Sequence, residues 1–107
     1  MSEHTFDVAT NIRMTEQLQC QMLALLSDFF TAMHQNVSKS NQAEILADME
    51  IALFLMAKRL GISKELLDRK AVSAIRATLL KTEHTLWKED LLHILYAMEN
   101  EGTVNGG

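Results

Sequence analysis

The sequence predicts an all-α protein, a small bundle of about four helices that we expect to self-associate. The 107 residues include no proline, and three of the four glycines lie between positions 102 and 107, so little interrupts long helices. Apolar residues recur at alternating steps of three and four, which is the period of an amphipathic helix. With 48% hydrophobic residues, the chain is expected to form a single helical domain over 1–107, with a flexible arm at 1–12 and a flexible tail at 101–107.

The first helix is expected over residues 13–37. Its inner face repeats at steps of four and three and consists of Leu18, Met22, Leu25, Phe29 and Ala32. Leu23, Phe30 and Val37 widen this stripe to about half of the helix circumference, at about 100° per residue. Packing against one neighbour requires a narrower stripe, so the width predicts an additional contact surface.

The second helix is expected over residues 41–60. Ile51, Phe54 and Leu55 lie on one side. The other side carries the main apolar stripe, which consists of Ile45, Met49, Ala52, Leu53, Met56 and Leu60. The second half of this helix is therefore apolar nearly all round, which predicts that it is covered on both sides.

Short polar segments mark the expected helix ends. Asn41, followed three residues later by Glu44, resembles a capping box at the start of the second helix. Gly61 is expected to end that helix as a C′ glycine, and Ser63 can cap the helix that follows.

Two further helices are expected over residues 63–81 and 86–100, with a break at 81–85. No glycine or proline lies between positions 62 and 101, so a single helix over 63–100 remains an alternative. The apolar stripes of the two halves point about 150° apart, at about 100° per residue. One straight helix could not bury both stripes against the same core, which favours two helices.

Charge is segregated along the chain, although the net charge is only −4. Residues 58–81 contain seven Lys and Arg residues against two Asp and Glu residues, whereas 1–57 and 82–107 are acidic. Such a basic segment can attract phosphate or an acidic partner. Alternatively, it faces the acidic surface of its own chain or of a second copy.

Residues 54–70 resemble a DNA-binding helix-turn-helix. An alanine four residues before Gly61 and a leucine six residues after it would let two short helices cross closely. The candidate contacts to DNA or another anion are Lys64, Arg69, Lys70 and Arg76. The isoelectric point of about 5.5 argues against DNA, as do the acidic side chains of Glu65 and Asp68. A DNA-binding regulator is therefore the alternative function.

No residue set predicts a catalytic site, a metal site or a cofactor. Glu89 and Asp90 lie four and three residues before His93, but a di-iron bundle needs that unit twice, with carboxylates from two other helices. Cys20 is the only cysteine and has no evident paired base, so we interpret it as a packing residue. The first residues lack the basic and apolar regions expected of a signal peptide, and no apolar run is long enough to span a bilayer. We expect a non-enzymatic, cytoplasmic protein of bacterial or phage type.

The surplus of apolar surface favours a protein–protein interaction module, an adaptor, inhibitor or chaperone that binds through helical surfaces. We expect a homodimer and a protein partner, and no membrane partner. The predicted interface residues are Phe29, Phe30, Met33, Ile51, Phe54 and Leu55. Trp87 and Tyr96 belong to residue types that are common as interface anchors, and they suit a core or its rim equally well.

Residues 20–53 resemble, without gaps, the helical hairpin of small enterobacterial anti-adaptor proteins, which block delivery of the stationary-phase sigma factor to its protease. The matching residues are Cys20, Leu26, Thr31, Ala32, Met33, Asn36, Gln42, Glu50, Ala52 and Leu53. The resemblance stops downstream of Ala57 and carries over no functional residue. It implies a small helical protein that inhibits or adapts by occupying a partner's surface.

Overall fold

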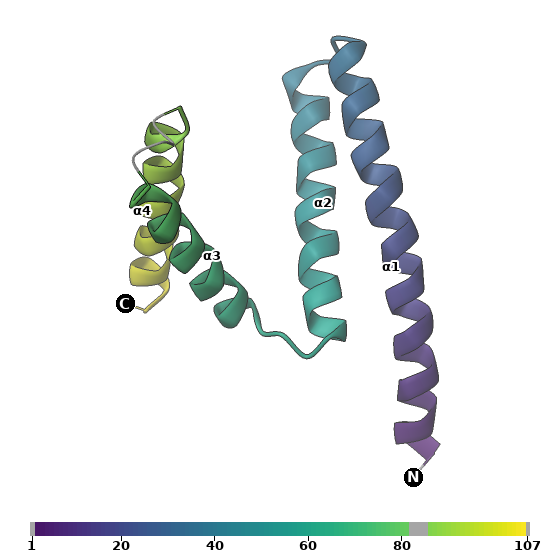
Figure 1. The fold of residues 1–107 in the computed structure, drawn as a ribbon. Helices are drawn as coiled ribbons and strands as arrows, with labels where there is room; N and C mark the ends of the chain where they lie inside the picture. Colours follow the sequence, from purple (N-terminus) through teal and green to yellow (C-terminus); the bar gives the residue numbers. More distant parts are fainter. Residues whose placement is uncertain (1, 82–85, 107) are drawn as a thin grey trace. The chain divides into compact units, whose positions relative to one another are not determined.

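The computed structural model describes residues 2–81 and 86–106. These residues form no strand, and their four α-helices are α1 (Ser2–His34), α2 (Lys39–Arg59), α3 (Lys64–Leu79) and α4 (Lys88–Gly106). The predicted all-α fold with about four helices is confirmed. The chain groups into two compact units, Met1–Ser63 and Lys64–Gly107, and each unit contains two helices (Figure 1).

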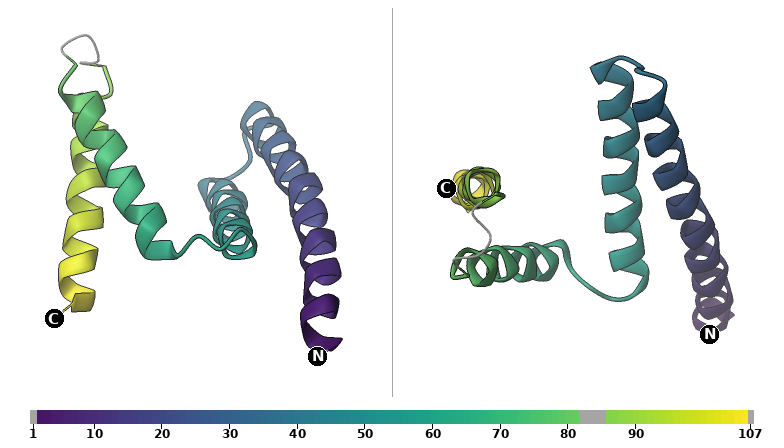
Figure 2. Two further views of the ribbon diagram at one scale, coloured as in Figure 1. Left: turned by 60° about the horizontal axis from the view of Figure 1, so that its bottom comes forward. Right: turned by 45° about the horizontal axis from the view of Figure 1, so that its top comes forward.

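The first unit is a helix hairpin in which α1 and α2 run antiparallel and lie side by side (Figures 1 and 2). Its most deeply buried side chains are Leu18 and Ala32 of α1 and Ala52 and Ala57 of α2. Ala52 is only 1% exposed, because its small side chain lies where the facing helix approaches. Three of these four residues are alanines, so the hairpin buries little apolar volume.

Helix α1 begins earlier than the sequence predicted. It starts at Ser2 rather than at residue 13, so residues 2–12 of the predicted arm are helical. Val8 and Ile12 continue the apolar spacing that runs through Leu23, and neither glycine nor proline interrupts the helix. With 33 residues against 21 in α2, α1 extends past the end of its neighbour (Figure 1).

Helix α1 also ends before the predicted boundary at residue 37, at His34. Asn36 adopts a left-handed conformation with a φ of 55°. The backbone N–H of Val37 donates to the carbonyl of Ala32 at 3.2 Å, and the N–H of Asn36 donates to that of Met33 at 3.4 Å. This pair of hydrogen bonds is a Schellman motif, and asparagine tolerates the left-handed conformation that it requires.

The N-terminus of α2 is capped by Ser38, whose Oγ accepts a hydrogen bond from the N–H of Asn41 at 3.2 Å. The helix therefore begins at Lys39, before the predicted start at residue 41. The predicted capping box of Asn41 and Glu44 is wrong. Asn41 already lies within the first turn, where the serine hydroxyl satisfies its free N–H group.

Gly61 ends α2 as the sequence predicted. Its φ is 78°, its N–H donates to the carbonyl of Lys58 at 3.2 Å, and the N–H of Ile62 donates to that of Ala57 at 2.8 Å. This is a second Schellman motif, and glycine adopts its left-handed position without steric cost.

We expect Gly61→Ala to lower the free energy of unfolding by about 1 kcal/mol. A Cβ atom at this position would meet nothing within 4 Å, so the cost comes from the backbone conformation and not from crowding. Asn36→Gly is the matched control: it places glycine at the other left-handed position and should leave stability equal or slightly higher. Urea unfolding of both variants measures the difference, and an unchanged midpoint for Gly61→Ala would contradict the expectation.

Two hydrogen bonds join the N-terminal half of α1 to the C-terminal end of α2. The Asn11 side-chain amide donates to the backbone carbonyl of Arg59 at 3.0 Å, and the Arg59 guanidinium donates to Asn11 Oδ1 at 3.1 Å. Both groups are part-buried. This reciprocal pair fixes the register of the hairpin at the end opposite its connecting turn.

The second unit pairs α3 with α4 (Figures 1 and 2). Its half-buried apolar residues follow helical spacing, and they include Leu67, Ala71, Ile75, Leu79, Leu91, Leu95 and Met98. The Arg76 guanidinium of α3 forms an ion pair with the Glu99 carboxylate of α4. Among the described residues of this unit, none is classed as fully buried, so its core is shallow.

The chain between residues 63 and 100 is not one helix, because α3 ends at Leu79 and α4 begins at Lys88. The predicted break at 81–85 falls in this interval, and its residues 82–85 lie outside the described part of the chain. Helix α4 continues to Gly106, so residues 101–106 of the predicted flexible tail are helical. None of the described helices combines the length and the hydrophobicity needed to cross a membrane.

Candidate functional site

An apolar groove of about 620 Å³ runs along one side of the α1–α2 hairpin. It is lined by Gln19, Met22, Leu23, Leu26, Met49, Leu53 and Met56. Three of these residues are methionines, whose unbranched side chains adapt to irregular surfaces. The lining contains no charged side chain, so the groove suits an apolar protein surface.

The apolar surface continues beyond the groove in both directions. Phe30 and Met33 lie seven residues after Leu23 and Leu26, and Leu46 and Leu60 lie seven residues on either side of Leu53, so all of them share the groove side of their helices. We call this surface the groove face. Its large apolar side chains are between 40% and 71% exposed, and they are Val8, Ile12, Leu23, Leu26, Phe30, Met33, Leu46, Leu53 and Leu60.

The opposite side of the hairpin carries a smaller apolar surface. Ile51 and Leu55 each lie two residues from Leu53, which places them on the other side of α2. Both are about half exposed, at 54% and 45%. Leu55 lines a shallow hollow of about 240 Å³ together with Met14 and Arg59. We call the surface of Met14, Ile51 and Leu55 the back face.

The six predicted interface residues therefore do not form one patch. Phe30 and Met33 lie on the groove face, whereas Ile51 and Leu55 lie on the back face. The remaining two, Phe29 and Phe54, are half-buried. The Phe29 ring contacts that of Phe30, with centroids 6.4 Å apart and planes tilted by 51°.

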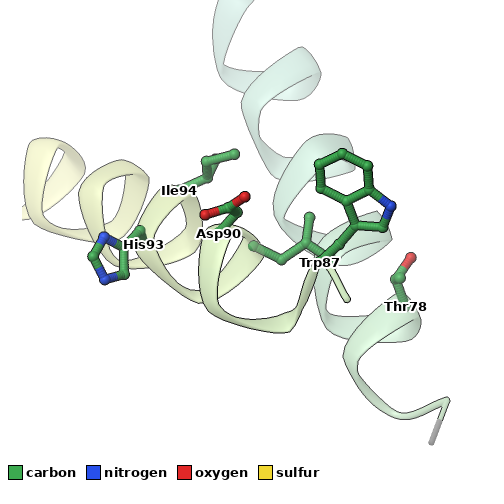
Figure 3. A pocket seen from close by; sticks show the side chains of 6 residues that line it. Thr78, Trp87, Asp90, His93 and Ile94 are labelled. Carbon is green, nitrogen blue, oxygen red and sulfur yellow. The ribbon is translucent and has the colours of Figure 1, made fainter. Parts of the chain in front are cut away.

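A second apolar hollow, of about 610 Å³, lies in the α3–α4 unit (Figure 3). Trp87 directly precedes α4, and Asp90 and Ile94 of α4 follow it at spacings of three and four. Thr78 of α3 completes the lining with Leu91 and His93. Trp87 is 58% exposed and Tyr96 is 69% exposed, so neither aromatic side chain is a core residue of the single chain.

The four candidate anion-binding residues have different environments. Lys64 pairs with Asp68 at 2.9 Å on the same helix, and Arg76 pairs with Glu99. Arg69 and Lys70 are exposed. Within the described residues, the basic segment is thus partly neutralised by acidic groups of its own unit, and the helix-turn-helix function stays a prediction.

No group of three His, Cys, Asp or Glu side chains among the described residues is placed to hold a metal ion. His93 and Asp90 both line the α3–α4 hollow, as their spacing suggested, while His84 lies outside the described residues. Cys20 is exposed, which corrects its interpretation as a packing residue.

Sequence reasoning named only part of the groove face. Met22, Met49 and Met56 were assigned to the inner stripes, and each is half-buried and lines the groove. The signal that could have located the groove is the width of the apolar stripe on α1. The one described helix that packs against α1, which is α2, covers part of that stripe, and the remainder lies beside the contact.

A comparison with models of protein families matches residues 8–91 to the MazG-like family. This match spans α2 and α3 completely, together with most of α1 and the start of α4. No curated protein and no solved structure matches the chain significantly. The comparisons do not test the resemblance of residues 20–53 to anti-adaptor proteins. Because the family match covers most of the sequence, the chain belongs to the MazG-like family.

Proposed function

We propose that this chain is a non-enzymatic protein–protein interaction module of the cytoplasm, an adaptor or inhibitor that binds through its helical surfaces. The observation that carries the proposal is the exposure of large apolar side chains on two sides of the α1–α2 hairpin. Large exposed apolar patches on small proteins mark interaction sites. The partners are proteins, among them a second copy of this chain.

The two faces of the hairpin support separate roles. The groove face is long and free of charged lining residues, which suits pairing with a like surface. The back face is smaller and has the Arg59 guanidinium at its edge, which suits a mixed polar and apolar contact with a different protein. MazG-like domains have helical, dimeric folds, and this supports self-association as one of the two roles.

Nucleotide hydrolysis is the enzymatic alternative, because MazG-like domains resemble nucleotide pyrophosphatases in fold. Magnesium ions that act on phosphates are held by carboxylates that lie close together. The described residues do not provide such a cluster, and the groove of the hairpin is lined by apolar side chains and one glutamine. The side chains present therefore do not fit a magnesium site, and we derive no catalytic step.

The test is affinity capture from the native host with the tagged, full-length chain. We expect a protein that is retained by the wild type and lost with the double variant Ile51→Glu, Leu55→Glu, because two charges on the back face cannot be desolvated in an interface. Ala43→Glu is the matched control, since it places the same charge at an exposed position of the same helix. It should retain the partner.

Three results would contradict the proposal. One is capture that the back-face charges leave unchanged, or no captured protein at all. Another is release of pyrophosphate from nucleoside triphosphates with Mg²⁺. The third is binding to duplex DNA that weakens steeply with salt, which would favour the helix-turn-helix function instead.

A further inference from the structure

We propose that the hollow of the α3–α4 unit binds an arginine side chain of a partner protein, with the guanidinium placed on the Trp87 indole and paired with the Asp90 carboxylate. The hollow lies in the second unit, so it is separate from the groove face and the back face of the hairpin. It shares with the proposed function only the premise that the chain binds proteins.

The hollow combines apolar walls with one carboxylate. Its volume of about 610 Å³ is typical of a ligand-binding cleft, and Trp87, Leu91 and Ile94 supply its apolar lining. Among the described residues that line it, Asp90 is the only acidic one, and none is a lysine or an arginine. Figure 3 shows the Asp90 and Ile94 side chains on the same side of α4, whereas the His93 ring points away from the indole.

The Asp90 carboxylate has no cationic partner within the described part of the chain. The arginines of the same unit do not supply one. Arg76 pairs with Glu99, and Arg69 lies nine residues before Thr78, which places it on the opposite side of α3 at about 100° per residue. A cation that pairs with Asp90 in the hollow therefore comes from another molecule.

An arginine side chain matches this hollow better than other ligands. Its planar guanidinium stacks on an indole face and donates parallel hydrogen bonds to a carboxylate, and the Trp87 side chain is accessible at 58% exposure. Asp90 would repel a phosphate or another anion. An entirely apolar side chain would remove water from the carboxylate without replacing its hydrogen bonds. Leu91 and Ile94 remain for apolar neighbours, so the ligand is an arginine within an apolar peptide segment.

The experiment titrates the full-length chain with a blocked tripeptide of leucine, arginine and leucine. Trp87 is the only tryptophan of the chain, so its fluorescence reports on the hollow directly. We expect a saturable change in emission, with a dissociation constant on the order of 1 mM for so small a ligand. The same peptide with neutral citrulline in place of arginine should bind about tenfold more weakly, because citrulline keeps the shape and loses the charge.

Two variants separate pairing in the hollow from the general effect of charge. Asp90→Asn should weaken binding of the arginine peptide by about tenfold, to the level of the citrulline peptide. Glu89→Gln is the matched control, because Glu89 lies in the same first turn of α4 and does not line the hollow. It should keep the affinity within about twofold. Both variants remove one charge from the helix N-terminus, so circular dichroism should show equal helicity.

The absence of a saturable change with the arginine peptide overturns this proposal. Equal binding of the arginine and citrulline peptides by the wild type overturns it without any variant, because the contact would then be apolar only. Equal effects of Asp90→Asn and Glu89→Gln overturn it as well, because the charge would then act from outside the hollow. Partner capture through the back face is measured separately, so the proposed function stands if only the arginine site fails.

Discussion

Ala52→Asp is expected to unfold the α1–α2 hairpin, with a loss of about 3–5 kcal/mol in the free energy of unfolding. Ala52 is 1% exposed and lies where α2 meets α1, so an aspartate there would place a carboxylate among apolar side chains without a partner. No other buried side chain in the described part of the chain is as inaccessible as that of Ala52.

Ala47→Asp is the matched control for this variant. Ala47 is exposed on the same helix, so the substitution carries the same loss of helix propensity, about 0.7 kcal/mol, without burying the charge. Urea unfolding followed by circular dichroism compares the two. Equal midpoints for Ala52→Asp and Ala47→Asp would show that α1 does not cover Ala52, and the hairpin itself would be in doubt.

Leu18→Ala and Leu23→Ala are expected to act in different ways, although both remove the same atoms from α1. Leu18 is 7% exposed, so its truncation should leave a cavity and cost about 2–4 kcal/mol at every protein concentration. Leu23 is 71% exposed in the single chain and becomes buried only in the proposed dimer. Its truncation should raise the dissociation constant of the dimer by about tenfold to a hundredfold.

Unfolding at two protein concentrations, together with sedimentation equilibrium, separates these effects. The midpoint of Leu18→Ala should fall by the same amount at both concentrations, whereas the fall for Leu23→Ala should be accompanied by a weaker dimer. If Leu23→Ala behaves as the wild type in both measurements, Leu23 does not lie in the dimer interface. A midpoint for Leu18→Ala that equals that of the wild type would contradict the packing of α1 against α2.

Membership of the MazG-like family and the apolar surface of the hairpin favour different functions. The MazG-like match covers most of α1, all of α2 and α3, and the start of α4. The described residues place apolar side chains, rather than clustered carboxylates, along the groove between α1 and α2. The chain is a member of this family, and we propose that it uses the helical scaffold to bind proteins.

The local signals in the sequence located some helix ends and misplaced others. Gly61 was correctly expected to end α2, because only a residue tolerant of positive φ fits that position. The start of α2 was misplaced, because Ser38 and Asn41 are both good capping residues and the choice depends on which N–H group is left free. Asn36 ended α1 early by the same left-handed geometry, which asparagine adopts less often than glycine.

The sequence by itself determined the helical class, the division into four helices, the glycine stop after α2 and the existence of a surplus of apolar surface. These features depend on period, on the absence of proline and on backbone conformation, all of which act over a few residues. Only the tertiary structure decided which part of that surplus is buried. A stripe half a helix wide does not reveal where the neighbouring helix lies along it, so Met22 and Met56 could not be told apart from true core residues. The register of α1 against α2, held by Asn11 and Arg59, divides the apolar residues into a thin core, a groove face and a back face.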